Sequence, residues 1–488
     1  MTTPIPFVGP LEEGTVPRVN SQRCINLVPQ VEGQGAGAPV TLRAAPGLKP
    51  YIVAGAAGSG CRPGSGVIFQ NNSYWVFGDE VVKVDLAGNK TQIGLLDTTG
   101  GNVSIAYNHL EMCIVDGSNN VYSYVPNNAT PWVKTALAAP FIATDPTDDG
   151  QVYPTSIAMK DFYFAINRTQ GGTTRKGNFY LSALNDGRTF TGASFTNAEA
   201  NPDAIIGLES TANDLICFGD FSIQHYFNVG STAFPFDPAR GRDIGWGLAA
   251  AAGKTKIEDT VYFLGQTKGN LKFVKHPGGV ISNIDIDNQL ARMSTTDDCR
   301  AFAYSQDGHF QVQFTFPSED KTWVYDLHSE NFYEKQSYGY GRHLATAALK
   351  FGGKLLVGIE GSGNLYEWDY ATYNDDGDMI YRERRAPIAA DPSGKEVSCT
   401  HLRIIMDAGL GSIAGEDPQV MLDYSIDGGI TFINEQQAGI GKQGERTTTV
   451  DFYSLGSSNC GFIFRVRMTD EAPWVIMGAV ASFEQGDW

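Results

Sequence analysis

The chain has 488 residues, of which 42% are hydrophobic, 11% aromatic and 18% charged, so it carries enough apolar material for a large core and is not a disordered chain. Its formal net charge of −18 argues against a protein that grips nucleic acid over its whole surface, because phosphate binding depends on Lys and Arg. No stretch approaches the run of about 18 apolar residues that a membrane-spanning helix needs.

The first 50 residues are rich in Pro and Gly and too irregular for a repeated strand pattern. The stretch Met1–Pro10 has no Lys or Arg followed by an apolar run, so it does not read as a secretory signal, and we expect the chain to fold in a cytoplasm. We expect residues 1–50 to pack on a carboxy-terminal unit. Closing a ring of sheets from the start of the chain is the alternative.

A repeated pair of strands dominates residues 51–385. Each pair begins with a short apolar strand, which a turn joins to a second strand of alternating aromatic or β-branched residues. The seven first strands are Tyr74–Phe77, Met112–Val115, Phe162–Ala165, Leu215–Phe218, Val261–Leu264, Phe310–Phe314 and Leu355–Val357. The seven second strands are Val82–Asp85, Val121–Tyr124, Phe179–Ser182, Ile223–Tyr226, Leu271–Val274, Trp323–Asp326 and Leu365–Asp369.

This repeat indicates the fold class. A period of about 40 to 50 residues with four strands is typical of a propeller blade, because one four-stranded sheet cannot bury both faces until neighbours stack around an axis. Helical periodicity is nearly absent from the sequence. We therefore predict an all-β chain with a six- or seven-bladed β-propeller.

The repeat ends at the turn-rich stretch Asn374–Asp378, and the polar stretch Ala390–Lys395 follows, which indicates a domain edge. Between them lie Arg382, Arg384 and Arg385, which we expect to form a solvated charge run rather than to meet an acidic partner. Longer strands then predict a small β-sandwich platform. The predicted domains are an amino-terminal segment over 1–50, a propeller over 51–385 and a sandwich over 386–488.

The segment Ser425–Phe432 matches the Asp-box pattern S-x-D-x-G-x-x-F, which occurs in the blades of sialidase-type propellers. The box itself is not catalytic. We interpret it as a structural turn, in which Ser425 and Asp427 bond the backbone, Gly429 supplies a positive φ, and Phe432 follows.

The sequence lacks several common catalytic motifs, although a site assembled from distant blades leaves no such local motif. It contains no HExxH and no G-x-S-x-G, and its seven His lie far apart. The seven Cys are scattered singly, mostly inside apolar runs, so we interpret them as buried small hydrophobes rather than as disulfides or metal ligands. We expect no catalytic residues, no metal and no cofactor.

Large side chains in loops without an obvious strand role are candidate contacts with other subunits or partners. Packing beneath a loop is the alternative for each of them. These candidates are Phe234, Pro235, Phe236, Arg240, Arg242, Trp246 and Trp474.

Three segments share the order and spacing of many weak elements with one known family. The first is Arg23–Pro29 with Ala45–Leu48; the second runs from Phe179–Ser182 through Asn185–Phe190, Asn201–Asp203 and Phe234–Phe236 to Ile244–Gly245; the third is Tyr424–Gly429 with Gly444–Arg446 and Phe464–Arg465. Together they resemble the packaged-DNA stabilisation, or tail hub ("nozzle"), proteins of short-tailed bacteriophages.

The resemblance implies a structural protein of the virion tail that forms a homo-hexameric ring below the portal and its adaptor, the head-to-tail connector. It also implies contacts with a tail fibre, tailspike or tail needle, and a lumen through which genomic double-stranded DNA passes without sequence-specific binding. No catalysis is implied. The alternatives are a glycan-binding or glycan-cleaving propeller, lectin or sialidase-like, and a scaffold propeller that binds peptides.

Overall fold

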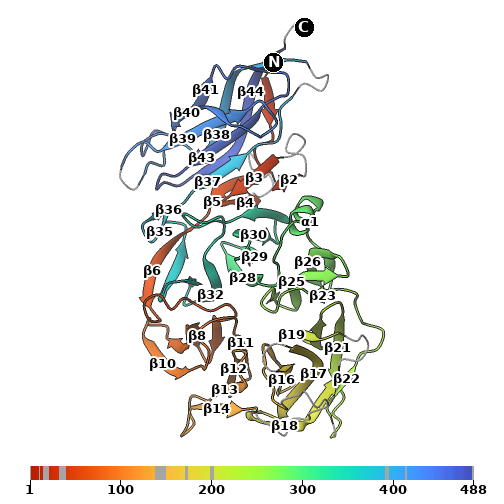
Figure 1. Ribbon diagram of the computed structural model, residues 1–488. Coiled ribbons are helices and arrows are strands. Elements are labelled where there is room, and N and C mark those ends of the chain that lie inside the picture. The colour runs from red at the N-terminus through yellow and green to blue at the C-terminus, as the bar shows by residue number, and fades with distance from the viewer. Residues whose placement is uncertain are drawn as a thin grey trace.

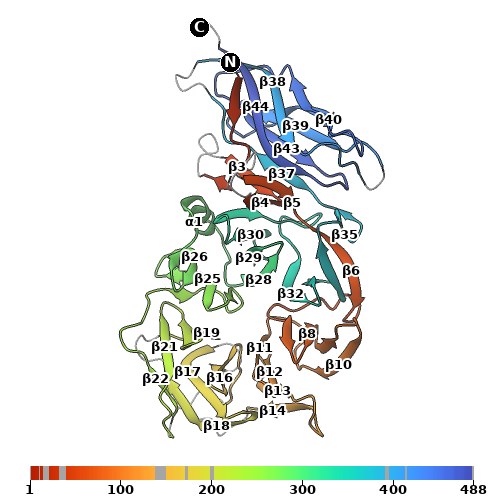
Figure 2. The same ribbon diagram turned by 180° about the vertical axis from the view of Figure 1, so that it is seen from behind.

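The computed structural model describes residues 2–9, 11–14, 21–31, 40–137, 150–170, 174–197, 203–232, 234–390, 395–412 and 415–485. Asn201 and Pro202, and residues 391–394 of the polar stretch, lie outside these ranges. The described chain forms a ring of sheets with a second β unit stacked on one side of the ring (Figures 1 and 2).

The ring contains seven sheets among the described residues, which we number as blades in chain order. Blade 1 is β7 (Val67–Phe69), β8 (Asn72–Phe77), β9 (Glu80–Val84) and β10 (Lys90–Leu95). Blade 2 is β11 (Ser104–Tyr107), β12 (Met112–Val115), β13 (Asn120–Tyr124) and β14 (Trp132–Ala136). Blade 3 is β15 (Ile157–Lys160), β16 (Tyr163–Gln170), β17 (Thr174–Ala183) and β18 (Asp186–Asn197). Blade 4 is β19 (Ile205–Ser210), β20 (Leu215–Gly219), β21 (Ile223–Asn228) and β22 (Phe236–Pro238).

The remaining blades follow the same antiparallel order. Blade 5 is β23 (Gly247–Leu248), β24 (Lys254–Ile257), β25 (Thr260–Thr267), β26 (Asn270–His276) and β27 (Gly279–Val280), and blade 6 is β28 (Arg300–Gln306), β29 (His309–Phe316), β30 (Lys321–Asp326) and β31 (Asn331–Glu334). Blade 7 is β32 (Ala345–Phe351), β33 (Lys354–Ile359), β34 (Asn364–Asp369) and β6 (Gly47–Val53), extended by β35 (Asn374–Asp375) and β36 (Asp378–Met379).

Apolar clusters between neighbouring sheets hold the ring together. Seven such clusters lie among the described residues, one at each junction. At the junction that closes the ring, Trp75 of blade 1 belongs to the same cluster as Leu356 of blade 7. Because each sheet is covered on both faces, its middle strands are continuous apolar runs rather than alternating ones, as in β12, which is buried throughout. The prediction of an all-β propeller is confirmed, and the blade count is seven.

The start of the chain supplies the last strand of the ring. β6 pairs antiparallel with β34, with Leu48 opposite Trp368 and Gly47 opposite Asp369. β6 includes residues on both sides of residue 50, where the sequence predicts the boundary between the amino-terminal segment and the propeller. Only Ala45 and Pro46 separate it from β5 (Val40–Ala44), which belongs to the second β unit.

The second β unit, which we call the platform, is a two-sheet sandwich. One sheet contains β1 (Thr2–Ile5), β4 (Leu27–Val31), β5, β38 (Val397–Met406), β41 (Val450–Tyr453), β42 (Ser457–Ser458) and β44 (Val475–Gln485). The other contains β2 (Glu12–Glu13), β3 (Ser21–Ile25), β37 (Arg382–Arg385), β43 (Ile463–Met468), β39 (Gln419–Ser425) and β40 (Ile433–Gly439).

This second platform sheet is continuous with blade 6. β3 pairs with β31 in parallel, with Ile25 opposite Glu334, and pairs with β37 on its other side. Strands of the propeller and of the platform therefore share one ten-stranded sheet. The expectation that Arg382, Arg384 and Arg385 form a solvated run is wrong, because they lie on β37 in the middle of this sheet, where Arg382 and Arg384 are fully buried.

Two further observations complete the fold. The only helix among the described residues, α1 (Ile284–Leu290), has seven residues, far fewer than a bilayer crossing requires. All seven Cys are free, and six of them are buried, as the sequence predicts.

Candidate functional site

The candidate contact loop of blade 4 begins with three side chains that turn toward the protein interior. Phe236 is 2% exposed in the cluster between blades 3 and 4, Pro235 is buried, and Phe234 is half-buried. The rings of Phe234 and Phe179 lie 5.9 Å apart. For Phe236 this burial favours the alternative of packing beneath a loop.

The other three candidates, Arg240, Arg242 and Trp246, lie at the end of the same loop and are at least partly exposed. Arg242 forms a two-point ion pair with Asp214, at 3.1 Å and 2.7 Å, and the same carboxylate lies 3.3 Å from Nδ1 of His225. Burial, reinforced by His225 and Arg242, lowers the pKa of His276 to about 4. Arg240 is exposed and Trp246 is half-buried. A subunit contact through these three residues stays a prediction.

Trp474, the candidate contact of the platform, is 1% exposed in the sandwich core. Its backbone carbonyl accepts a hydrogen bond from Ala44 N at 2.8 Å, which joins the start of the chain to the carboxy-terminal strands. Such burial leaves its ring in contact with its own protomer and favours the packing alternative.

The Asp-box-like turn connects β39 to β40 at the edge of the platform. The Asp427 carboxylate accepts hydrogen bonds from the backbone N–H groups of Ile430 and Thr431, each at 3.0 Å. Ser425 Oγ donates to Asp427 at 2.7 Å and accepts from Gly429 N at 2.7 Å. These bonds give the turn a structural role, and the side-chain hydrogen bonds from Thr431 and Ser425 are the main cause that holds the pKa of the Asp427 carboxyl below its usual range.

Phe432 follows this turn and lies close to two guanidinium groups. Arg465 lies 4.0 Å and Arg385 4.9 Å from the centre of its ring, distances at which a cation is attracted to an aromatic face. Arg465 is also paired with Asp423, with Nε 2.8 Å from Oδ1. The turn is therefore anchored to β37 and β43 of the ten-stranded sheet.

Replacing Ser425 by alanine is expected to lower the free energy of unfolding by about 1 to 2 kcal/mol, because Gly429 N and one Asp427 oxygen lose a buried partner. Urea denaturation measures the change. The matched control is Ser457→Ala, whose hydroxyl is exposed and which is expected to change stability by less than about 0.5 kcal/mol. Equal effects of the two substitutions would contradict the assigned role of the turn.

Sequence reasoning missed a buried charge cluster where the propeller meets the platform. Glu334, at the end of β31, is fully buried and pairs with Lys321 at 2.8 Å and with Arg23 at 2.8 Å. Burial disfavours its ionised form, but Lys321 and Arg23 outweigh burial and lower the pKa of Glu334 to about 2. The local sequence carries little signal for this cluster, because Arg23 lies on β3, where Ser21 and Gln22 are also polar.

Two arginines of β37 extend this cluster by donating hydrogen bonds to oxygens of distant segments, Arg384 to the amino-terminal segment and Arg382 to the connection that follows β43. Arg384 donates to the Phe7 carbonyl at 2.6 Å, to the Arg23 carbonyl at 3.3 Å and to the Gln22 side chain at 2.8 Å. Arg382 donates to the carbonyl of Asp470 at 3.0 Å, and burial lowers its pKa to about 10. Their role is to hold segments of the chain together.

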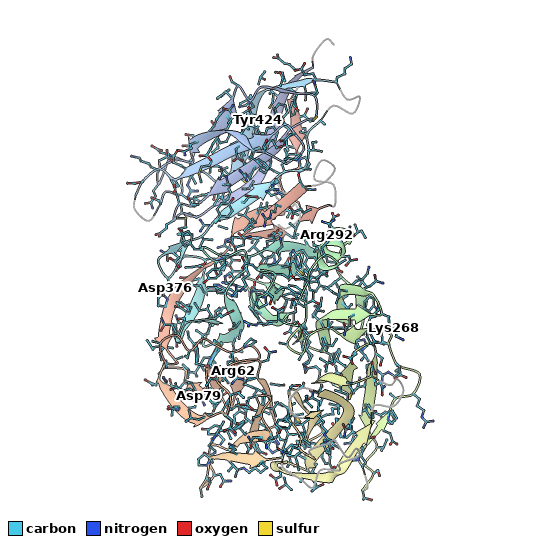
Figure 3. All side chains as sticks on the ribbon, viewed as in Figure 1. Arg62, Asp79, Lys268, Arg292, Asp376 and Tyr424 are labelled. Carbon is cyan, nitrogen blue, oxygen red and sulfur yellow. The ribbon has the colours of Figure 1, made fainter. Side chains whose placement is uncertain are left out.

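Arg62 performs a similar task at the junction of blades 1 and 2 and is labelled toward the middle of the ring in Figure 3. It is 3% exposed, and its guanidinium donates to the carbonyls of Gly101 at 3.0 Å, Thr98 at 2.8 Å and Gly100 at 2.7 Å. These bonds fix the connection between the two blades.

Arg62→Met should therefore lower the free energy of unfolding by about 2 to 4 kcal/mol, because several carbonyls lose a charged donor at once. The change is measured by urea denaturation, with proteolysis of the 97–102 connection as a local readout. Arg292→Met, at an exposed arginine, serves as the control. If the 97–102 connection of the Arg62 variant resists proteolysis as well as that of the unaltered chain, Arg62 does not fix this connection.

No group of three or more His, Cys, Asp or Glu among the residues described is placed to hold a metal ion. The charged groups in the clusters above bind one another or the backbone. Their arrangement joins parts of the chain that are distant in sequence.

Two family models match this chain in the same order as its two β units. The model described as the β-propeller of bacteriophage P22 Gp10 matches residues 10–373, and the model described as its β-sandwich matches residues 384–484. The chain belongs to the P22 Gp10 family. This is the family of tail nozzle, or packaged-DNA stabilisation, proteins, as the sequence resemblance indicates. The chain is thus a structural protein of a phage tail.

Solved structures similar to this Gp10 family member are propellers. A streptogramin B lyase shares 12% identity with a TM-score of 0.43, covering 66% of this chain and 96% of its own. Virginiamycin B lyase from Staphylococcus aureus shares 10%, with a TM-score of 0.41 and coverages of 64% and 95%, and the Pan2 WD40 domain of Neurospora crassa shares 8%, with 0.40 and coverages of 67% and 94%. Similarity at this level does not bear on activity. No curated protein matches the sequence.

Proposed function

We propose that this Gp10 family member assembles as a homo-hexameric ring that extends the DNA channel of a phage tail below the portal and adaptor. The ring retains packaged DNA and passes it at ejection. The observation that carries the proposal is the match of both family models, in order, over most of the chain. The protein is made in the bacterial cytoplasm and contacts the adaptor and a tail fibre, tailspike or tail needle.

The charge of the chain supports a channel through which DNA slides. Six copies with a formal charge of −18 each carry −108; an acidic lumen repels DNA phosphates, and a neutral lumen does not attract them. Screening over about 8 Å at physiological salt confines this repulsion to the channel wall, so the duplex is not held by ion pairs. Retention before infection then depends on a constriction or plug rather than on affinity.

Mass photometry and negative-stain microscopy of the purified chain, alone and with its adaptor, test the ring. Six copies of 52.8 kDa give a particle of about 317 kDa. Rings of that mass are expected. A stable monomer that binds saccharide would instead support a glycan-binding propeller, and a ring with a channel lined by Lys and Arg would contradict passive sliding.

A further inference from the structure

A groove opens at the waist between the propeller and the platform, where three parts of the chain meet. It is lined by Tyr338 from the connection between blades 6 and 7, by Gly377–Met379 at the β35–β36 turn, and by Thr469–Glu471 after β43. Its volume is about 440 Å³, within the range of about 300 to 1,000 Å³ of ligand sites. Asp376, beside this turn, marks the position in Figure 3.

Two large hydrophobic side chains of this groove, Tyr338 and Met379, are exposed to solvent. Tyr338 is 52% and Met379 43% exposed. Tyr340, two residues further along the same loop, is 47% exposed. The centre of its aromatic ring lies 5.2 Å from the guanidinium carbon of Arg342. Tyr and Met are enriched in the centres of protein interfaces, and neighbouring exposed apolar groups mark interaction sites. The groove thus offers apolar contact area to a protein.

The polar part of the lining is acidic. Asp378, Asp470 and Glu471 contribute carboxylates, and the described lining contains no Lys or Arg. Two carboxylates are fixed in advance, because Asp470 Oδ2 accepts from Gln419 N at 2.7 Å and Glu471 Oε1 accepts from the Asn374 side chain at 3.0 Å. Groups that are already ordered lose less conformational freedom when a partner binds.

The carboxylates and the exposed tyrosine ring of the groove together indicate which kind of partner it binds. Three carboxylates repel nucleic acid phosphates but attract Lys and Arg, and a guanidinium can also stack on a tyrosine ring such as that of Tyr338. We propose that the waist groove binds a segment of another tail protein in which Lys or Arg flanks a large apolar side chain. The inference rests on the proposed tail function and adds the place and the chemistry of one contact.

The test uses the full chain in assembled phage particles. Tyr338 is replaced by a photoreactive benzophenone amino acid, the particles are irradiated, and the linked peptides are identified by mass spectrometry. We expect an adduct with a Lys- or Arg-containing segment of another tail protein. The same amino acid at Tyr453, which is 59% exposed on the other platform sheet, is the control and should not give that adduct.

Charge-neutral variants of the groove separate binding from mere proximity. In the photoreactive chain, D378N with E471Q should reduce the yield of the adduct by at least about fivefold, because two attractive charges are lost. D237N with E258Q, at exposed sites on blades 4 and 5, removes the same charge and should leave the yield unchanged.

The outcomes separate this inference from the proposed function. An adduct with DNA, with another copy of this chain or with a segment that lacks Lys and Arg would overturn the groove assignment, as would no adduct or a yield that D378N with E471Q does not change. In all of these cases the chain is still part of the particle. Particles without the chain would overturn both the groove assignment and the tail function.

Discussion

Replacing Glu334 by alanine is expected to lower the free energy of unfolding by about 3 kcal/mol, because it breaks a buried ion-pair cluster. The substitution leaves the charges of Lys321 and Arg23 without their shared carboxylate at the end of β31. These two side chains are only 16% and 25% exposed, so water replaces the lost partner incompletely. Guanidinium denaturation measures the change.

The pH dependence of this effect provides a second readout. Glu334 has a pKa of about 2 in the folded chain against 4.5 as its ordinary value, so its ionised form stabilises the fold fully above pH 4.5. That contribution is lost as the pH falls toward 2. The stability difference between the unaltered chain and Glu334→Gln should therefore shrink over this interval.

A surface ion pair gives the matched control. Asp307 pairs with Arg43 at 3.1 Å, and their side chains are 54% and 33% exposed. Asp307→Asn should change the unfolding free energy by less than about 1 kcal/mol, because exposed pairs are weak. A stability loss in Glu334→Ala no larger than in Asp307→Asn would show that the junction does not depend on the buried cluster.

Trp474→Ala should destabilise the isolated protomer by about 3 to 5 kcal/mol, because it removes a fully buried indole from the sandwich core and leaves a cavity. The loss should be the same at low and high protein concentration, measured by thermal unfolding. Tyr453→Ala, at an exposed ring of the same platform, is the control and should cost less than about 0.5 kcal/mol. A loss that appears only where subunits associate would instead identify Trp474 as an interface residue.

Much of the propeller could be predicted from the sequence because its middle strands are buried on both faces. The first strand of each predicted pair falls on the second strand of a blade, from Tyr74–Phe77 in β8 to Leu355–Val357 in β33. The second strand of each pair falls on the third, from β9 to β34. Complete burial leaves short apolar runs that can be recognised without knowing their neighbours.

Contacts between distant parts of the chain could not be predicted in this way. The three arginines of β37 have the composition of a solvated run, and they lie inside the sheet because β37 pairs with β3, more than 350 residues earlier, on one side and with β43 on the other. The pairing of β6 with β34 is equally remote, and its local sequence carries no signal for its partner. The burial of Phe236 and Trp474 could not be predicted either. The sequence alone does not show whether a large side chain in a loop is covered by the protein's own core or by another subunit.

The ten-stranded sheet has a mechanical consequence. Hinges need a few residues that can change backbone angles freely, but Ala45 and Pro46 are the only residues between β5 and β6, and Ala45 N is bonded to the Asn26 carbonyl at 2.9 Å. β3 adds a second tie between the two units. The propeller and the platform are thus expected to move as one rigid body. In the proposed ring, a change in channel width would then require movement between whole subunits.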